Sequence, residues 1–229
     1  MAANQGRKDI IYDTQCAMIN KASADKSFDI QKLSEFDRLK IMMALYQANM
    51  FQNEVKFTCE YCGEDNKYTI DFNNVLNRLD DFDLEPKKHV YENRDYKYTF
   101  TVRFPSVYTV SQFHKSYCQK HRGVPRKMQT ADENVQNMEY INLFIKEIEI
   151  EGKNRDYHLT INMDDYKAGD YEDILERLSQ DVLYSDKGIL TFIVNNLVKP
   201  LNDQFDKHKC WKCGEVHEKG DVGSPEGFF

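Results

Sequence analysis

The sequence predicts an α+β protein in which helices pack on small antiparallel sheets. Residues 96–104 alternate apolar and polar side chains, and this period of two is typical of a strand with one buried face. After Ser34, apolar residues recur at three- and four-residue spacing, which indicates an amphipathic helix that Ser34 can cap. The first of two C-x-x-C-G sequences, at residues 59–63 and 210–214, lies between two strand-like runs, which is typical of a hairpin.

The first half of the chain contains most of the strongly patterned segments. Residues 10–28 carry apolar side chains without clean periodicity, so only short buried pieces are expected there. The expected elements that follow are a helix from about 34 to 50, strands 53–58 and 67–72, a short helix from Asn73 or Asn74, and paired strands 89–91 and 96–104.

The second half alternates helical and strand patterns. Thr130 and Glu133 have the spacing of a capping box for one of its helices. The expected elements are helices 107–121 and 130–145, a hairpin of strands 147–151 and 157–163, a helix from Asp170 to 182, and a helix from Ser185 that Pro200 kinks or ends.

These patterns suggest one main domain with two additions. Residues 1–52 form an N-terminal segment with one amphipathic helix, and residues 53–219 form the main α+β domain. Residues 220–229 contain Gly, Ser and Pro and are expected to be a flexible tail. Its terminal Phe228-Phe229 pair is a candidate hook into a neighbouring subunit, and a frayed end is the alternative.

Composition limits the classes of function. The formal net charge of the 229-residue chain is -7, which argues against a phosphate-driven nucleic-acid binder, because such binding depends on clustered Lys and Arg. The apolar runs are too short for a membrane-spanning helix, and no secretory signal is recognised at the N-terminus. We therefore expect the six cysteines to be in a reducing compartment, where paired C-x-x-C sequences are more often metal ligands than disulfides.

The two cysteine pairs are the strongest chemical signal. Cys59, Cys62, Cys210 and Cys213 supply four thiolates, which is the ligand set of a closed, structural zinc site with tetrahedral geometry. Most of the chain lies between the two pairs, whereas compact zinc modules place them roughly 15–20 residues apart. The sequence therefore predicts one Zn²⁺ per chain, in a zinc-ribbon-like hairpin closed by a C-terminal cysteine knuckle.

Several alternatives remain open for the cysteine and histidine residues. The pairs can instead be a redox dithiol or two unrelated turns, and His208 or His217 can replace one cysteine ligand. Cys16 and Cys118 lack partner spacing and are expected to be buried thiols. A nucleophilic site is conceivable on the 107–121 helix, where the relevant side chains are His114, Cys118 and His121.

No enzymatic motif stands out. The sequence lacks a glycine-rich phosphate loop, H-E-x-x-H and G-x-S-x-G, so we expect no catalytic and no cofactor-binding residues. The acidic runs 80–83 and 164–165 lack the calcium-loop pattern and are read as solvated turns. The basic cluster 120–127 is read as a linker or a contact to an acidic partner.

The cysteine hairpin resembles one in a family of phage proteins. The matching stretches are Val55–Gly63, Tyr68–Phe72, Tyr98–Pro105, Ile145–Ile150, Asp173–Leu178 and the second cysteine pair. They resemble the baseplate hub subunit and hub-assembly proteins of T-even-like phages with contractile tails. Only the two cysteine turns are specific, and the N-terminal 50 residues add nothing to the resemblance.

The resemblance implies a non-enzymatic role in building the tail. The protein would be a late virion structural or tail assembly protein of the baseplate hub, made in the host cytoplasm and located in the virion. Its partners would be other baseplate and tail proteins, within an oligomeric assembly. The alternative function is a zinc-ribbon nucleic-acid-binding or regulatory protein.

Overall fold

The computed structural model describes residues 8–48, 54–120, 140–154, 156–204 and 208–217. The chain divides into two compact units, each built from separate parts of the sequence. Unit 1 comprises residues 1–35 and 84–198, and unit 2 comprises residues 36–83 and 199–229. The boundaries expected from the sequence, 52/53 and 219/220, lie outside the described residues, as does the expected tail 220–229.

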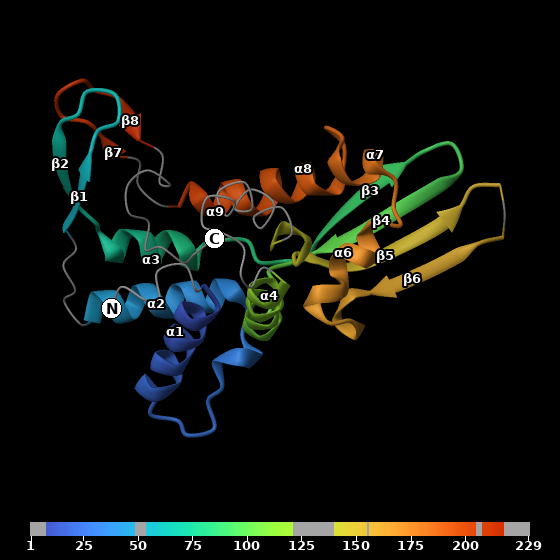
Figure 1. Ribbon diagram of the computed structural model, residues 1–229, viewed down its shortest axis with the longest axis horizontal. Helices are drawn as coiled ribbons and strands as arrows, with labels where there is room; N and C mark the ends of the chain where they lie inside the picture. The colour runs from blue at the N-terminus through green and yellow to red at the C-terminus, as the bar shows by residue number, and fades with distance from the viewer. Residues whose placement is uncertain (1–7, 49–53, 121–139, 155, 205–207, 218–229) are drawn as a thin grey trace. The chain divides into compact units, whose positions relative to one another are not determined.

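Unit 1 is organised around a four-stranded antiparallel sheet with the strand order β3-β4-β5-β6 (Figure 1). Its strands are β3 (Lys87–Glu92), β4 (Tyr96–Val102), β5 (Ile145–Gly152) and β6 (His158–Asn162). Phe100 pairs with Ile148 in the register of β4 and β5, and both side chains are fully buried. The expected alternation of buried and solvated residues in β4 is confirmed, and the two expected hairpins join into one sheet.

Helices α1 and α4 of unit 1 pack against each other through aromatic and polar side chains. Helix α1 (Lys8–Ala22) packs against α4 (Val107–Lys120), where the ring of Tyr12 lies 5.2 Å from that of His114. Ser111 donates a 2.8 Å hydrogen bond to Asp13, which joins the same two helices. Further helical elements of unit 1 are η2 (Ile30–Lys32), η3 (Met163–Asp165), η4 (Ala168–Asp170), α6 (Tyr171–Leu175), α7 (Gln180–Tyr184), α8 (Ile189–Ile193) and the π-helical η5 (Val194–Val198).

Unit 2 contains two antiparallel helices and two small hairpins. Helix α2 (Glu35–Ala48), which begins at the last residue of unit 1, runs alongside α3 (Phe72–Asp80). The Phe36 and Phe82 rings stack at 5.2 Å near one end of this helix pair, and the Tyr46 and Phe72 rings stack near the other. The hairpins are β1 (Glu54–Thr58) with β2 (Asp65–Thr69), and β7 (His208–Lys209) with β8 (Val216–His217), and α9 (Lys199–Asn202) completes the unit.

The mixed helix-and-sheet class predicted from the sequence is confirmed, and its largest described sheet is the four-stranded antiparallel one of unit 1. Several local expectations are wrong. The expected strand 67–72 is β2 (Asp65–Thr69), since Phe72 already begins α3, and the helix expected from Ser185 begins at Ile189. Residues 8–22 form one helix rather than short pieces, the expected helix 170–182 is split into α6 and α7, and the chain is already in β5 at Ile145, where a helix was expected. Within the expected helix 130–145, residues 130–139 lie outside the described residues, and residues 140–142 are helical.

Candidate metal centre

Two short loops of unit 2 hold the four cysteines. The knuckle at residues 59–64 joins β1 to β2, and the knuckle at residues 210–215 joins β7 to β8. Both knuckles read C-x-x-C-G-E, and each lies between a pair of strand residues in register, Thr58 with Asp65 and Lys209 with Val216. The predicted hairpin is confirmed for the first pair, and the second pair lies in a hairpin of the same kind.

The same hydrogen bonds shape both knuckles. In the first, the N–H of Gly63 donates to the carbonyl of Cys59 at 2.7 Å, and the N–H of Cys59 donates to the carbonyl of Glu64 at 2.8 Å. The second repeats this pattern, with Gly214 donating to Cys210 at 2.9 Å and Cys210 donating to Glu215 at 2.8 Å. The two loops therefore have matching backbone geometry although most of the chain separates them.

Each knuckle closes through a glycine in the left-handed region. Gly63 has φ of 69° and Gly214 has φ of 76°, a conformation that other residues rarely adopt. A Cβ built on Gly63 would meet no atom within 4 Å, so backbone conformation rather than space explains the glycine at this position. The same residue type in the same conformation therefore closes both C-x-x-C turns.

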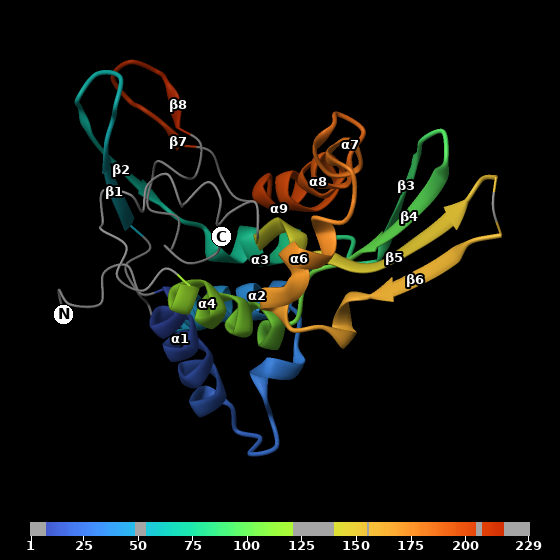
Figure 2. The same cartoon turned by 45° about the vertical axis from the view of Figure 1, so that its right-hand side comes forward.

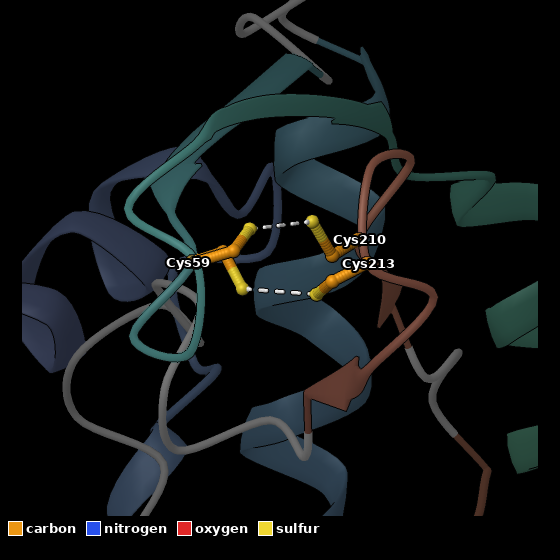
Figure 3. A group of neighbouring side chains, drawn as sticks. Cys59, Cys210 and Cys213 are labelled. Atoms are coloured by element: carbon orange, nitrogen blue, oxygen red, sulfur yellow. Dashed lines mark hydrogen bonds between the residues drawn. The ribbon is translucent and has the colours of Figure 1, made fainter.

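The four sulfur atoms come together in one cluster. Cys59 points from its loop toward the loop that carries Cys210 and Cys213 (Figure 3). The four Sγ atoms lie within 4.8 Å of one another. Two contacts cross between the knuckles, with Sγ–Sγ distances of 3.7 Å for Cys59 and Cys213 and 3.6 Å for Cys62 and Cys210. The structure thus brings all four predicted ligand residues together.

These distances fit a metal tetrahedron and exclude disulfides in this structure. A tetrahedral ion with metal–sulfur bonds of about 2.3 Å has sulfur–sulfur edges of about 3.8 Å, close to the two cross-knuckle distances. A disulfide requires about 2.05 Å between its sulfur atoms, and the four cysteines are free thiols. The cluster can therefore hold one metal ion through four thiolates, which leaves no ligand position for a substrate.

Backbone and amide donors favour a thiolate at Cys210. The N–H of Cys213 is the largest influence, and together with the N–H of Lys212 and the Asn66 amide it lowers the pKa of Cys210 to about 6 despite burial. At Cys62 the N–H of Glu64 also lowers the pKa, but burial and the three neighbouring cysteines raise it to about 12. Four thiolates crowded together repel one another, so a bound cation is the natural means of keeping them all ionised.

Asn66 on β2 connects the two knuckles and was missed in the sequence. Its side chain is 4% exposed, and its amide nitrogen lies 3.6 Å from the Cys210 sulfur and 2.8 Å from the Glu64 carbonyl. Its oxygen accepts a 3.0 Å hydrogen bond from the N–H of Trp211. A single buried amide thus fixes the second knuckle against the first hairpin and orients one sulfur ligand.

Two more contacts join the knuckles at their surface. The indole N–H of Trp211 donates to the carbonyl of Asp65 at 3.2 Å, and Lys212 forms an ion pair with Glu64. This ion pair, with the charges of the nearby thiolates as a smaller influence, raises the pKa of Lys212. Because Lys212 and Glu64 lie at the surface, the pair is expected to stabilise the site less than the buried Asn66 contacts do.

The other candidate residues of the sequence do not join this centre. The metal-ligand cluster found among the described residues contains cysteine sulfurs only. His208 and His217 pair through their backbones in β7 and β8, and the structure does not describe their side chains. Cys16 is a buried thiol in α1, as expected.

The conceivable nucleophilic site on α4 gains no support. The ring of His114 packs 5.2 Å from that of Tyr12 and 6.3 Å from that of Tyr140, within a cluster of aromatic rings in unit 1. The structure does not describe the side chain of Cys118. It also does not describe residues 121–127, which include His121 and most of the basic cluster.

Within the described ranges, no helix has the length and apolarity to cross a membrane.

Among the described residues, the four cysteines of unit 2 form the candidate metal centre. Comparison of the chain with protein-family models, with curated proteins and with solved structures gave no match.

Proposed function

We propose that the four cysteines bind one structural Zn²⁺ that fastens the C-terminal hairpin to the N-terminal part of unit 2. The observation that carries this proposal is the convergence of four sulfur atoms within 4.8 Å from two matching knuckles. Zinc suits a tetrahedral site with four sulfurs and has no redox chemistry, although iron takes the same ligand set. Structural zinc contributes on the order of 10–16 kcal/mol in small peptides, as much as the whole stability of a domain.

The metal content of the purified protein tests this proposal. We expect about one zinc per chain, because four cysteines saturate one tetrahedral ion. Cys59→Ser and Cys210→Ser are each expected to abolish zinc binding, since the ligands come from both knuckles of one site. Cys16→Ser, which changes a buried thiol outside the cluster, is the matched control and should keep the metal. Retention of zinc in Cys210→Ser, or iron in place of zinc, would contradict the proposal.

We further propose that the chain is a structural or assembly component of a phage tail baseplate, in the hub region. This proposal is supported by the resemblance of the cysteine turns and flanking strands to hub proteins. It is consistent with a metal centre whose ligands are all provided by the protein, which suits a structural role better than catalysis. The partners would be other tail and baseplate proteins, and the site of action the virion.

Mass spectrometry of purified tails and of baseplate assembly intermediates tests the proposed place. If the chain is found in both purified tails and assembly intermediates, it is a permanent component. If it is found in the intermediates alone, it is an assembly factor. Deletion of residues 224–229, which include the Phe228-Phe229 pair, is expected to weaken incorporation while leaving the stability of the free chain unchanged. Absence of the chain from both fractions would refute the baseplate assignment.

A zinc-ribbon nucleic-acid binder is the second candidate, and one observation favours it. Tyr61 is 72% exposed and Trp211 is 70% exposed on the two knuckles, and exposed aromatic side chains can stack on bases. The net charge of -7 opposes it, because it repels phosphates. A gel-shift titration at two salt concentrations decides between the candidates, since tight and salt-sensitive binding lost in Trp211→Ala would favour nucleic acid.

A further inference from the structure

The β6 edge of the unit 1 sheet lacks a neighbour in the described part of the chain. The strand pairs with β5 on one side, and Figures 1 and 2 both show no described helix or strand beyond it. His158, Leu159 and Thr160 are exposed, and Leu159 is 40% exposed although it lies in a row of apolar side chains. This edge therefore presents both backbone hydrogen-bonding groups and apolar surface.

The register shows which backbone groups point away from the sheet. The N–H of Gly152 donates to the carbonyl of Tyr157 at 2.8 Å, so this facing pair is hydrogen-bonded. Hydrogen-bonded and non-bonded pairs alternate along an antiparallel ladder. The pair of Ile150 and Leu159 lies two positions further along, so it is also hydrogen-bonded. The N–H and C=O groups of His158 and Thr160 consequently point toward the open side of β6.

The two edges of the sheet differ in how they are protected. Edge strands usually avoid unwanted pairing through charged side chains, proline or a covering element. β3 has Lys87, Lys88 and Glu92, and its His89 ring contacts the Lys187 carbonyl at 2.8 Å and stacks on Phe192. β6 has the sequence HLTIN, without Lys, Arg, Asp, Glu or Pro. Only β3 carries these protective features.

We propose that β6 pairs with β6 of a second copy of this chain, antiparallel and with the two-fold axis at Thr160. In this register Thr160 faces Thr160 of the copy, Leu159 faces Ile161, and His158 faces Asn162. The outward backbone groups of Thr160 then bond directly to those of its copy. The strand is thus complementary to itself, as a two-fold interface requires.

The side chains support this register on both faces. Tyr98, Ile150 and Leu159 form one apolar row across β4, β5 and β6, and Phe100, Ile148 and Ile161 form the next. Pairing at Thr160 places Ile161 of the copy after Leu159, so both rows continue through the second molecule. On the opposite face two threonines meet, a favourable cross-strand pair, and no like charges face each other within the strand.

The dimer is expected to be weak. A single pair of short strands buries little surface and belongs to the small, transient class of interfaces. The exposed carboxylate of Asp156, just beyond one end of the strand, opposes close approach of two copies, whereas that of Asp164 beyond the other end is paired with Arg103 at 2.6 Å. We expect a dissociation constant on the order of 10–100 µM for the isolated chain.

Sedimentation equilibrium of the full chain over a range of concentrations tests the proposal. Thr160→Lys places two ammonium groups face to face, and Thr160→Pro removes the N–H that would donate to the backbone carbonyl of the copy. Both changes leave the β5–β6 hydrogen bonds intact, because the backbone of Thr160 points outward. We expect each to weaken dimerisation at least tenfold, with unchanged circular dichroism and zinc content. Val90→Lys, at a residue 49% exposed on β3, is the matched control and should dimerise like the wild type.

Hydrogen exchange locates the interface independently. Peptides covering β6 should gain protection as the wild-type concentration rises, while peptides covering β3 should not. A chain that stays monomeric at a concentration tenfold above the expected dissociation constant overturns the proposal. So does a dimer that survives Thr160→Lys, or protection gained at β3 instead of β6. Because zinc binding is measured separately, failure here leaves the proposed metal function intact.

Discussion

At the scale of single residues, Asn66 is the most informative side chain outside the four cysteines. It contacts the Cys210 sulfur and fixes Trp211, so we expect it to position the second knuckle for the metal. Asn66→Ala should weaken zinc affinity about 10–100-fold, as the loss of comparable supporting groups does in other sites. Competition with a chromophoric zinc chelator measures this change.

Asn66→Asp separates the acceptor contact of the amide from its two donor contacts. The aspartate keeps an acceptor for Trp211 but loses the donor to the Cys210 sulfur and to the Glu64 carbonyl, and it adds negative charge beside the thiolates. We therefore expect its zinc affinity to be at least as low as that of Asn66→Ala. Lys67→Ala, on the same strand, is a neighbouring control. Wild-type affinity in both Asn66 variants would show that the amide does not support the metal.

Tyr171 in unit 1 makes stability depend on pH in the alkaline range. Burial is the largest influence and, with the charge of Asp164, raises the pKa of Tyr171 from 10.0 to about 12. Its neutral form is favoured in the folded state, so its contribution is fully present below pH 10.0 and is lost as pH rises toward about 12. Urea unfolding of wild type and Tyr171→Phe at pH 9 and pH 11 should show a smaller loss in the variant. Equal losses would contradict this assignment.

At the scale of elements, prediction succeeded where a short-range pattern decides the structure. β4 was predicted because its alternating side chains meet one buried face, and α4 because its apolar stripe is clear. Helix α1 was missed although Tyr12, Cys16 and Ile19 are buried at helical spacing. The exposed Ile11 and Met18 obscured that stripe, since the sequence does not reveal which apolar residues face solvent.

The left-handed glycines of the knuckles lead to a prediction at the same scale. Gly63→Ala places a Cβ in the left-handed region, which costs about 1–2 kcal/mol of folding free energy without any steric clash. Gly63→Asn should cost less, because asparagine adopts this conformation more readily. Thermal unfolding of the zinc-loaded protein measures both. Equal stability of the alanine and asparagine variants would show that the turn relaxes to another conformation.

At the scale of the whole molecule, the metal centre could be predicted only in part. The C-x-x-C-G spacing identifies the four cysteines that the structure brings together, because paired cysteine turns are typical of metal sites. The contribution of Asn66 could not be predicted, since its contact with Cys210 joins residues far apart in the chain. The division into two discontinuous units could not be predicted either, because packing between residues far apart in the chain decides it and leaves no local pattern.

Removal of the metal should affect the two units differently. All four ligands belong to unit 2, whereas unit 1 has a core of its own around Phe100, Val102 and Ile148. Chelation should release the β7–β8 hairpin and lower hydrogen-exchange protection in β1 and β2, while β4 and β5 keep theirs. Returning zinc should restore protection, because binding and folding of such a site are linked. Equal loss of protection in β4 and β5 would mean that the centre stabilises the whole chain, and no loss anywhere would mean that the hairpins hold together without a metal.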